Sequence, residues 1–324
     1  MTVQTQAWRW QAADKSLLLE PFATAELAPQ QVLVRNTVAA VNPVDWKLIG
    51  WGPASWQQGQ VPGVDGVGVI ATVGSEVDAA LIGKRVAYHS DLTGHGSFAG
   101  YTVIDSSRAM LIPDNVTDAQ AASMPCPGLT AQQALGKLGN VDGKQILVCG
   151  GNSAVGLFAV QLLVKAGAIV WTTAAADSHP KLREMGAAHC FDYRDQSWPQ
   201  QLVEQLPQGL DGAIDLVSSE HAASLYDLLG YGAHLVAVLG RVEPLGDAFA
   251  KCVSLHEVAL GASYQYANAL QIAELKQQGE QMLVDIGSGR LHHPELVIGE
   301  FAELPKLLQQ AQSGVRKGKF LAVL

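Results

Sequence analysis

The sequence predicts an α/β protein of two domains, a β-rich domain and a doubly wound parallel sheet. The first observation is a strand, a glycine turn, a helix and a second strand between residues 145 and 173. The second is a regular alternation of strands and helices that continues after this unit. The third is a series of short strands separated by glycines in the first third of the chain, which is typical of a barrel or sandwich.

The central motif is the segment 145–173. The apolar run 146–149 predicts a buried strand, and segment 154–166 carries apolar residues at helical spacing. The turn between them keeps the outer glycines of the dinucleotide-binding pattern but has serine at the middle one. Such a unit places free N–H groups and a positive helix end below a pyrophosphate, although a simple strand-to-helix turn is the alternative. The predicted cofactor-binding residues of the turn are Gly151, Asn152, Ser153, Ala154, Val155 and Gly156.

The composition describes a globular protein with an acidic charge balance. The chain has 324 residues, 16% of them charged, with a formal net charge of −9 and a pI near 5.4. An acidic balance argues against nucleic acid as the main partner. No secretory signal or membrane-spanning segment is evident, and the four widely spaced cysteines indicate reduced thiols. We therefore expect a cytoplasmic protein that acts on a small molecule, without a nucleic-acid or membrane partner.

The elements expected before the central motif are mostly strands. Strand composition is clear at 31–41, and the glycines of segment 62–74 disfavour a helix. Shorter strands are expected at 83–88 and 96–104.

Helices are expected at 118–123 and 128–138, and βα units follow them. The predicted strands are 146–149, 169–173, 190–192, 212–217, 234–239 and 255–261. The helices predicted between them are 154–166, 179–185, 198–206 and 220–229. The chain is expected to close with a helix at 267–285, a strand at 295–299, a helix at 302–312 and a strand at 319–324.

Seven motifs spread over the whole chain carry a family resemblance. They are Val41-Asn-Pro-Val-Asp45, Pro62-Gly-Val-Asp-Gly-Val-Gly68, Gly83-Lys-Arg-Val86, Gly96-Ser-Phe-Ala-Gly-Tyr101, Pro127-Gly-Leu-Thr-Ala131, the turn at 150–156 and Gly318-Lys-Phe-Leu321. Their order resembles the medium-chain dehydrogenase/reductase superfamily, in particular its zinc-free quinone oxidoreductase branch. Together these motifs are more specific than the glycine turn alone.

The resemblance implies a GroES-like domain built from residues 1–122 and 264–324, with a Rossmann domain at 123–263 inserted between them. The last strand would then return to the first domain. It also implies a homodimer, because relatives pair their last Rossmann strand across a two-fold axis. In this chain that strand is the apolar segment 257–262, which would otherwise present an unpaired edge.

The resemblance also bears on zinc. Zinc-dependent relatives carry a cysteine where this chain has Asn42 and a histidine where it has Val64, and Cys126 stands near a third ligand position. One thiol cannot supply the three protein ligands of a catalytic zinc, so we expect no metal.

Without zinc, the favoured reactions are those that produce delocalised anions, such as hydride addition to a quinone or to the β-carbon of an enone. We therefore expect an NADPH-dependent quinone or enone reductase that does not use zinc. A non-enzymatic, nucleotide-loaded binding or structural protein is the first alternative. A zinc-independent alcohol dehydrogenase is the second.

Three residues are the catalytic candidates. Asn42 follows a strand at the former metal position, so it is expected to contact nicotinamide or substrate, with a turn before Pro43 as the alternative. Lys47 is a donor to a developing oxyanion or else a solvated lysine. Tyr88, like His89, follows a strand and is a proton relay or a structural residue, and solvent is the other proton source. Asp45 is expected to orient Asn42 or Lys47, or to bind local backbone N–H groups.

The remaining cofactor-binding candidates stand at strand ends or match family positions. Strand ends at the carboxyl edge of a doubly wound sheet face the cofactor. These candidates are Thr173, Val217, Ser218, Leu239 and Gly240. Thr130 and Lys319 match a threonine and a lysine that lie near the cofactor in the family, with a surface role as the alternative for Lys319.

NADPH is predicted over NADH because the second strand ends in alanines rather than an acid. An acid there would accept bonds from the ribose hydroxyls and repel a 2′-phosphate. The first acid, Asp177, comes several residues late, and Ser178 and Lys181 are the predicted phosphate-binding residues.

Overall fold

The computed structural model describes residues 2–247 and 249–324. The chain forms two compact units, Met1–Cys126 with Gly261–Leu324, and Pro127–Leu260. The first unit is the β-rich domain and the second is the doubly wound α/β domain, so the predicted fold class is confirmed. The domain limits expected from the sequence fall within a few residues of these boundaries.

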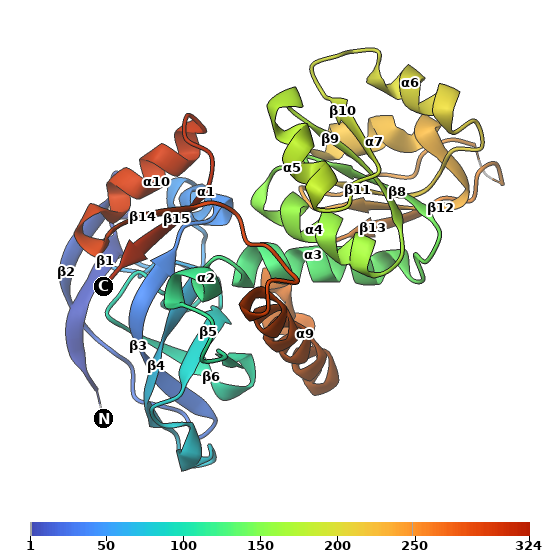
Figure 1. Cartoon of the computed structure of the whole chain (residues 1–324). Helices are drawn as coiled ribbons and strands as arrows, with labels where there is room; N and C mark the ends of the chain where they lie inside the picture. The colour runs from blue at the N-terminus through green and yellow to red at the C-terminus, as the bar shows by residue number, and fades with distance from the viewer. Residues whose placement is uncertain (1, 248) are drawn as a thin grey trace. The chain divides into compact units, whose positions relative to one another are not determined.

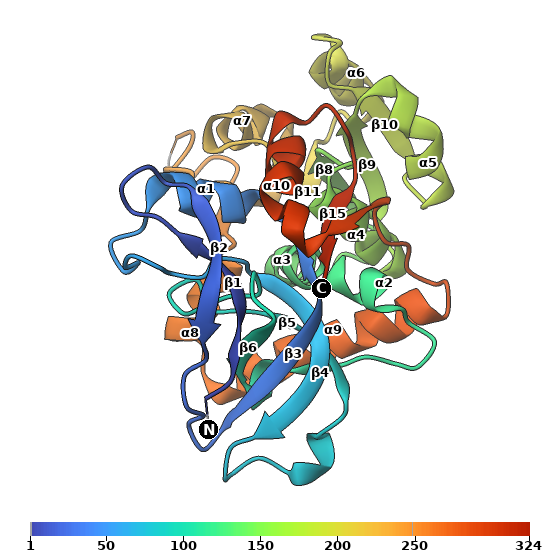
Figure 2. The same ribbon diagram turned by 90° about the vertical axis from the view of Figure 1, so that its left-hand side faces the viewer.

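The first unit is built on a mixed sheet. Its strand order is β14-β15-β3-β4-β5-β7, and β6 pairs with β3. Strand β15 from the C-terminal end pairs antiparallel with β3 from the N-terminal part, so the last strand returns to the first domain as the resemblance implied (Figure 2). The strands of this sheet are β3 Gln31–Ala40, β4 Asp65–Val73, β5 Arg85–His89, β6 Tyr101–Asp105, β7 Met110–Leu111, β14 Leu296–Glu300 and β15 Lys319–Val323. Strands β1 Gln4–Trp10 and β2 Leu17–Ala23 pair with each other in a separate antiparallel sheet.

The first unit also contains several helices. They are α1 Pro43–Trp51, α2 Asp118–Ala122, the start of α3 Pro125–Leu138, α8 Ser263–Tyr266, α9 Ala269–Gly287 and α10 Leu304–Ser313. Leu304, Leu307 and Leu308 of α10 pack with Phe320 of β15 in one buried cluster. No helix among the described residues is long and apolar enough to cross a bilayer.

The second unit has a parallel sheet of order β10-β9-β8-β11-β12-β13 (Figure 1). Its strands are β8 Gln145–Cys149, β9 Ile169–Ala174, β10 His189–Asp192, β11 Leu210–Asp215, β12 Leu229–Ala237 and β13 Ser254–Glu257. Its helices are the rest of α3, α4 Ala154–Lys165, α5 His179–Glu184, α6 Trp198–Gln205 and α7 Ser219–Ser224. Short 3₁₀ helices include η3 Ala176–Ser178, η4 Leu225–Leu228 and η5 Leu260–Ala262.

Burial on both faces explains why these strands are continuously apolar. Trp198 and Leu202 of α6 pack with Leu225 and Leu228 of η4 against one face of the sheet. Helix α4 packs against β8 and β9, and most of its residues from Gly156 to Leu163 are buried.

Some predicted elements differ from the structure. The strand expected at 255–261 ends at Glu257, because its neighbour β12 ends at Ala237, the residue that pairs with Glu257. The helix expected at 220–229 ends at Ser224 and continues as the 3₁₀ helix η4. The segment after Asn42 is the helix α1, with proline at a favourable first position.

Candidate active site

The turn after β8 is held by the neighbouring strand. Gly150 has φ 84°, and the N–H groups of Gly150 and Gly151 both donate to the carbonyl oxygen of Thr173, over 3.1 and 3.0 Å. The Thr173 hydroxyl also accepts from Gly150 N–H at 3.2 Å. Thr173 is buried, so the structure assigns it to positioning the turn through its backbone and hydroxyl.

Two glycines of the turn are required by close backbone approach. A Cβ on Gly156 would overlap the carbonyl oxygen of Gly150 and lie 2.7 Å from Cα of Gly151. A Cβ on Gly151 would overlap the hydroxyl of Thr172. The first turn of α4 therefore packs directly on the glycine turn, which is the role of the last fingerprint glycine.

Ser153, at the middle position of the pattern, caps α4. Its hydroxyl accepts the N–H of Gly156 at 3.0 Å, and its side chain is exposed. Ala154 and Val155 occupy the first turn, where N–H groups have no acceptor within the helix. Free N–H groups at the positive end of a twelve-residue helix, next to a turn that begins with two glycines, fit a pyrophosphate.

The predicted phosphate-binding group after β9 is connected to the turn. Asn152 donates from Nδ2 to Ser178 Oγ at 2.8 Å, and Ser178 donates to Asp177 Oδ1 at 3.0 Å. Ser178 is buried, whereas Lys181 on α5 is half-buried.

The other cofactor candidates lie at the ends of β11 and β12 or on α3. Val217 and Ser218 donate their N–H groups to Asp215 Oδ1, over 2.9 and 3.0 Å. Gly240 has φ 110°, and a Cβ there would lie 3.1 Å from Cβ of Ser219, so the two strand ends are adjacent.

Leu239, beside Gly240, is exposed. Thr130 is buried in α3.

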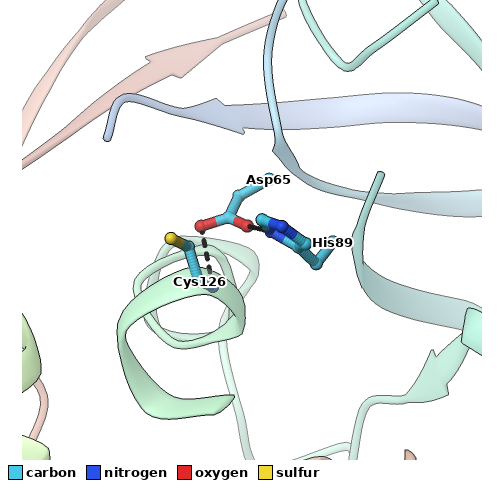
Figure 3. A group of neighbouring side chains, drawn as sticks. All are labelled: Asp65, His89 and Cys126. Atoms are coloured by element: carbon cyan, nitrogen blue, oxygen red, sulfur yellow. Dashed lines mark hydrogen bonds and ion pairs between the residues drawn. The ribbon is translucent and has the colours of Figure 1, made fainter. Parts of the chain in front are cut away.

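A buried polar cluster forms at the start of β4 in the first unit. Asp65 is fully buried and is its centre. Its Oδ1 pairs with Nδ1 of His89 at 2.9 Å, and its Oδ2 accepts from the backbone N–H of Cys126 at 3.0 Å. Figure 3 shows the carboxylate between the His89 ring and the start of α3 at Cys126. These contacts join β4, β5 and α3.

Asn42 and Lys319 complete this cluster from opposite ends of the chain. Asn42 donates from Nδ2 to Asp65 Oδ2 at 2.8 Å and accepts a bond from Nζ of Lys319 at its Oδ1. The Lys319 Nζ is also 3.5 Å from Asp65 Oδ2. Both side chains are buried, with 2% and 3% exposed, so Lys319 does not have the surface role considered as the alternative.

The charges of this cluster balance one another. Burial alone would raise the pKa of Asp65, but the Lys319 ammonium, the His89 ring and the Asn42 amide hold it below its usual value. The site therefore contains a buried carboxylate matched by a buried cation.

Asp45 binds backbone rather than side chains. Its Oδ2 accepts from the N–H of Asn42 at 2.7 Å and its Oδ1 from the N–H of Val64 at 3.0 Å. Burial raises the pKa of Asp45 to about 7. Of the roles considered for Asp45, binding of local N–H groups is the one that its contacts support. By binding the backbone N–H of Asn42, Asp45 also holds in place the residue whose side chain contacts Lys319.

The position of Tyr88 does not support the predicted catalytic role. Its side chain is fully buried among the residues of the barrel core, and its hydroxyl donates to Asn36 at 2.7 Å. A strand alternates its side chains between two faces, so Tyr88 points into the core while His89 points to Asp65. Lys47 lies half-buried on α1.

Among the described residues, Asp65, His89 and Cys126 are close enough together to hold a metal ion. Asp65 already accepts bonds at both oxygens, and the Lys319 ammonium lies 3.5 Å from one of them. A dication at Asp65 would be repelled by this ammonium and would have to displace its hydrogen bonds. The donor set does not fit a catalytic zinc.

Asp65 was missed as a site residue in the sequence analysis. Its only sequence signal was a charged residue inside an apolar, glycine-rich strand segment, where a buried charge needs a partner. His89 was considered, but its pairing with Asp65 depends on the register of β4 and β5, in which the two residues are direct partners.

Two family models match the chain. One describes the alcohol dehydrogenase GroES-like domain and matches residues 28–114. The other describes a zinc-binding dehydrogenase and matches residues 154–274. Each model falls mainly on one of the two units.

Curated proteins and solved structures also resemble the chain. A trans-enoyl reductase of Aspergillus japonicus is 32% identical over 231 residues, covering 67% of this chain and 67% of that protein. The chloroplastic NADPH-dependent alkenal/one oxidoreductase of Arabidopsis thaliana is 31% identical over 267 residues, covering 76% of this chain and 65% of that protein. A quinone oxidoreductase of Pseudomonas syringae pv. Tomato has the same fold, with a TM-score of 0.85 at 22% identity and coverage of 99% and 100% of the two chains.

Proposed function

Because the chain belongs to the medium-chain dehydrogenase/reductase superfamily, in its quinone oxidoreductase-like branch, we propose that it transfers hydride from NADPH to a quinone or an α,β-unsaturated carbonyl compound without zinc. Relatives named as enoyl and alkenal/one reductases support this reaction class. A nicotinamide dinucleotide is the cofactor of this superfamily, and NADPH is our specific proposal.

The second unit binds the dinucleotide. The N–H groups of Ala154 and Val155 bind the pyrophosphate, and Gly156 lets the first turn of α4 pack on the glycine turn so that these groups are held in place. Ser178 and Lys181 bind the adenosine end. When bound, NADPH supplies the hydride.

The first unit supplies the electrostatic environment of the acceptor. Hydride addition to a quinone or enone creates negative charge on a carbonyl oxygen, which a preorganised cation stabilises best in a dry site. Lys319 is a buried cation held by Asn42 and Asp65, and it takes the place that a Lewis acid has in zinc enzymes. The proton that completes the reaction comes from His89 or from solvent.

An apolar pocket adjoins this cluster in the first unit. Leu48, Trp56, Val64 and Leu92 line it together with Asp45, and Val64 directly precedes Asp65. The proposal rests on two features that occur in the same chain. One is the glycine turn at 150–156, and the other is the buried cluster of Lys319, Asn42 and Asp65, whose side chains do not suit zinc.

A turnover assay of purified protein tests the proposal. Quinones, enones and enoyl thioesters are supplied with NADPH or NADH, and zinc is measured by elemental analysis. We expect NADPH oxidation that depends on at least one conjugated carbonyl acceptor and that survives a chelator. Stoichiometric zinc removed together with the activity would contradict the zinc-free reaction. Tight dinucleotide binding without any turnover would favour the nucleotide-loaded binding protein instead.

A further inference from the structure

A second titratable cluster lies in the Rossmann unit, separate from the cluster around Asp65. Cys149 is the last residue of β8, Asp215 is the last residue of β11, and the two are direct partners in the sheet. His221 on α7 completes the group, and the three side chains offer ligand atoms within 4.8 Å of one another.

The Asp215 carboxylate is fixed at both oxygens. Its Oδ1 accepts the N–H groups of Val217 and Ser218, and its Oδ2 binds Nδ1 of His221. Only 1% of the Asp215 side chain is exposed, whereas 29% of the His221 side chain is exposed. The imidazole is therefore held in one orientation at one nitrogen, and part of its ring remains open.

A metal ion is a poor occupant of this cluster. Burial, followed by the nearby charge of Asp215, raises the pKa of the Cys149 thiol far above its usual value. Cysteine binds metals as the thiolate, and this thiol stays neutral. What remains at the site is a histidine backed by a buried carboxylate.

The position of this pair in the sheet indicates its ligand. Strands β9 and β10 lie on one side of β8, whereas β11, β12 and β13 lie on the other, so the chain reverses direction across the sheet between β8 and β11. Ligands of doubly wound sheets bind outside the carboxyl ends of the strands at this switch point. Asp215 and Cys149 end the two strands that flank it.

The glycine turn lies against the same strand end. Gly150 directly follows Cys149, and a Cβ on Gly150 would lie 3.5 Å from Cβ of Leu216. A ring nitrogen of His221 lies within 4.8 Å of the Cys149 sulfur, and Cys149 directly precedes the turn that the proposed function assigns to the pyrophosphate.

We propose that His221, positioned by Asp215, hydrogen-bonds to a pyrophosphate oxygen of the dinucleotide from Nε2. The Asp215 carboxylate holds Nδ1, so Nε2 is the ring nitrogen that remains for a ligand. The titratable groups that face the ring are Asp215 from β11 and Cys149 from β8, and the thiol is neutral. This inference rests on the proposed function, because it assigns a further residue to the same dinucleotide site.

The test compares His221→Ala and His221→Gln with the wild type by titration of NADPH, NADH and adenosine 2′-monophosphate, which lacks the pyrophosphate. Loss of one charge-assisted hydrogen bond is expected to raise the dissociation constants of NADPH and NADH about tenfold in the alanine variant. The glutamine variant, which keeps a donor, should lose less. Binding of adenosine 2′-monophosphate should be unchanged. His189→Gln, at the amino end of β10 and hence the opposite edge of the sheet, is the matched control.

A second readout separates a lost phosphate contact from a structural effect. Urea unfolding without dinucleotide should give both His221 variants a free energy of unfolding close to that of the wild type, so that the weaker binding is not due to misfolding. Unchanged dinucleotide affinity in a folded His221→Ala variant would overturn the inference alone. Equal weakening of adenosine 2′-monophosphate would do the same. A wild-type protein that binds no dinucleotide would overturn the proposed function as well.

Discussion

Replacing Gly156 by alanine is expected to disrupt dinucleotide binding through a backbone clash. The new Cβ would overlap the Gly150 carbonyl oxygen and lie 2.7 Å from Cα and 2.8 Å from the carbonyl carbon of Gly151. Carbon atoms in contact normally lie about 3.5–4.0 Å apart, so the turn must withdraw by about 1 Å. All three obstructing atoms belong to the backbone, and no side chain can rotate away to relieve the clash.

The magnitude follows from this displacement. Overpacking of a closely packed site costs about 1–3 kcal/mol, so the free energy of unfolding should fall by that amount. The N–H groups of Ala154 and Val155 begin the same helix turn, and a 1 Å shift misaligns them with a pyrophosphate. We expect the NADPH dissociation constant to rise at least about tenfold. Gly156→Asp should do worse, because a carboxylate there repels the phosphates.

Gly136→Ala is the matched control. Gly136 is an exposed residue of α3, and a Cβ there meets nothing within 4 Å. Alanine should stabilise this helix by about 0.5–1 kcal/mol and leave NADPH binding unchanged. Urea unfolding and NADPH titration of both variants measure the two effects. If Gly156→Ala bound NADPH as tightly as Gly136→Ala did, the assignment of this turn to the pyrophosphate would be refuted.

Three further predictions concern the first unit and the sheet edge. Lys319→Met removes the buried cation beside Asp65 and should lower the free energy of unfolding by about 3–5 kcal/mol, together with loss of turnover. Lys306→Met, which removes an exposed cation, should change neither, and equal effects of the two variants in urea unfolding would contradict the role of Lys319. The folded-state pKa of Asp45, about 7, lies above its unfolded value, so protonated Asp45 stabilises the fold at low pH. The free energy of unfolding should therefore fall by about 4 kcal/mol as the pH rises from about 4 to about 7. Asp45→Asn should flatten this part of the stability profile, and an unaltered profile would show that another group is responsible. The unpaired edge of β13 should pair with a second copy, and a monomer in sedimentation at micromolar concentration would argue against this homodimer.

The doubly wound unit was the part of the fold that the sequence predicted best. The run 146–149 and the helix 154–166 match β8 and α4 within one residue at each end, because apolar runs and helical spacing are local signals. The hairpin of β1 and β2 was missed. Its β2 strand has exposed leucines at 18 and 19 and contains Pro21, so the alternation that marks a half-buried strand is absent.

In the candidate site, too, local features could be predicted from the sequence and long-range contacts could not. Residues of the glycine turn could be proposed as a dinucleotide site from the sequence, because one short segment contains them all. The Lys319–Asn42 contact joins residues 277 positions apart, and only the family resemblance placed both near the cofactor. Asp65 and the Asp215–His221 pair were not identified, because their contacts depend on which strand ends are neighbours. Strand order is a property of the whole sheet that no local pattern encodes.

The predicted preference for NADPH over NADH depends on two opposite charges near the end of β9. Strand β9 ends at Ala174, so no acid stands where NAD-selective folds hold the ribose hydroxyls. Asp177 comes three residues later and accepts a hydrogen bond from Ser178, a predicted phosphate ligand. Its carboxylate would oppose a 2′-phosphate, whereas Lys181 at the same helix would attract it.

These opposing charges make the cofactor preference testable at two positions. Lys181→Ala should raise the Michaelis constant for NADPH and leave that for NADH nearly unchanged, because only NADPH carries the 2′-phosphate. Asp177→Asn should lower the Michaelis constant for NADPH, since it removes a like charge while keeping a polar side chain beside Ser178. Lys137→Ala, on the exposed part of α3, is the control and should affect neither cofactor. Equal efficiency of the wild type with NADH and NADPH would show that Asp177 governs the ribose site, and the NADPH assignment would then be wrong although the fold is correct.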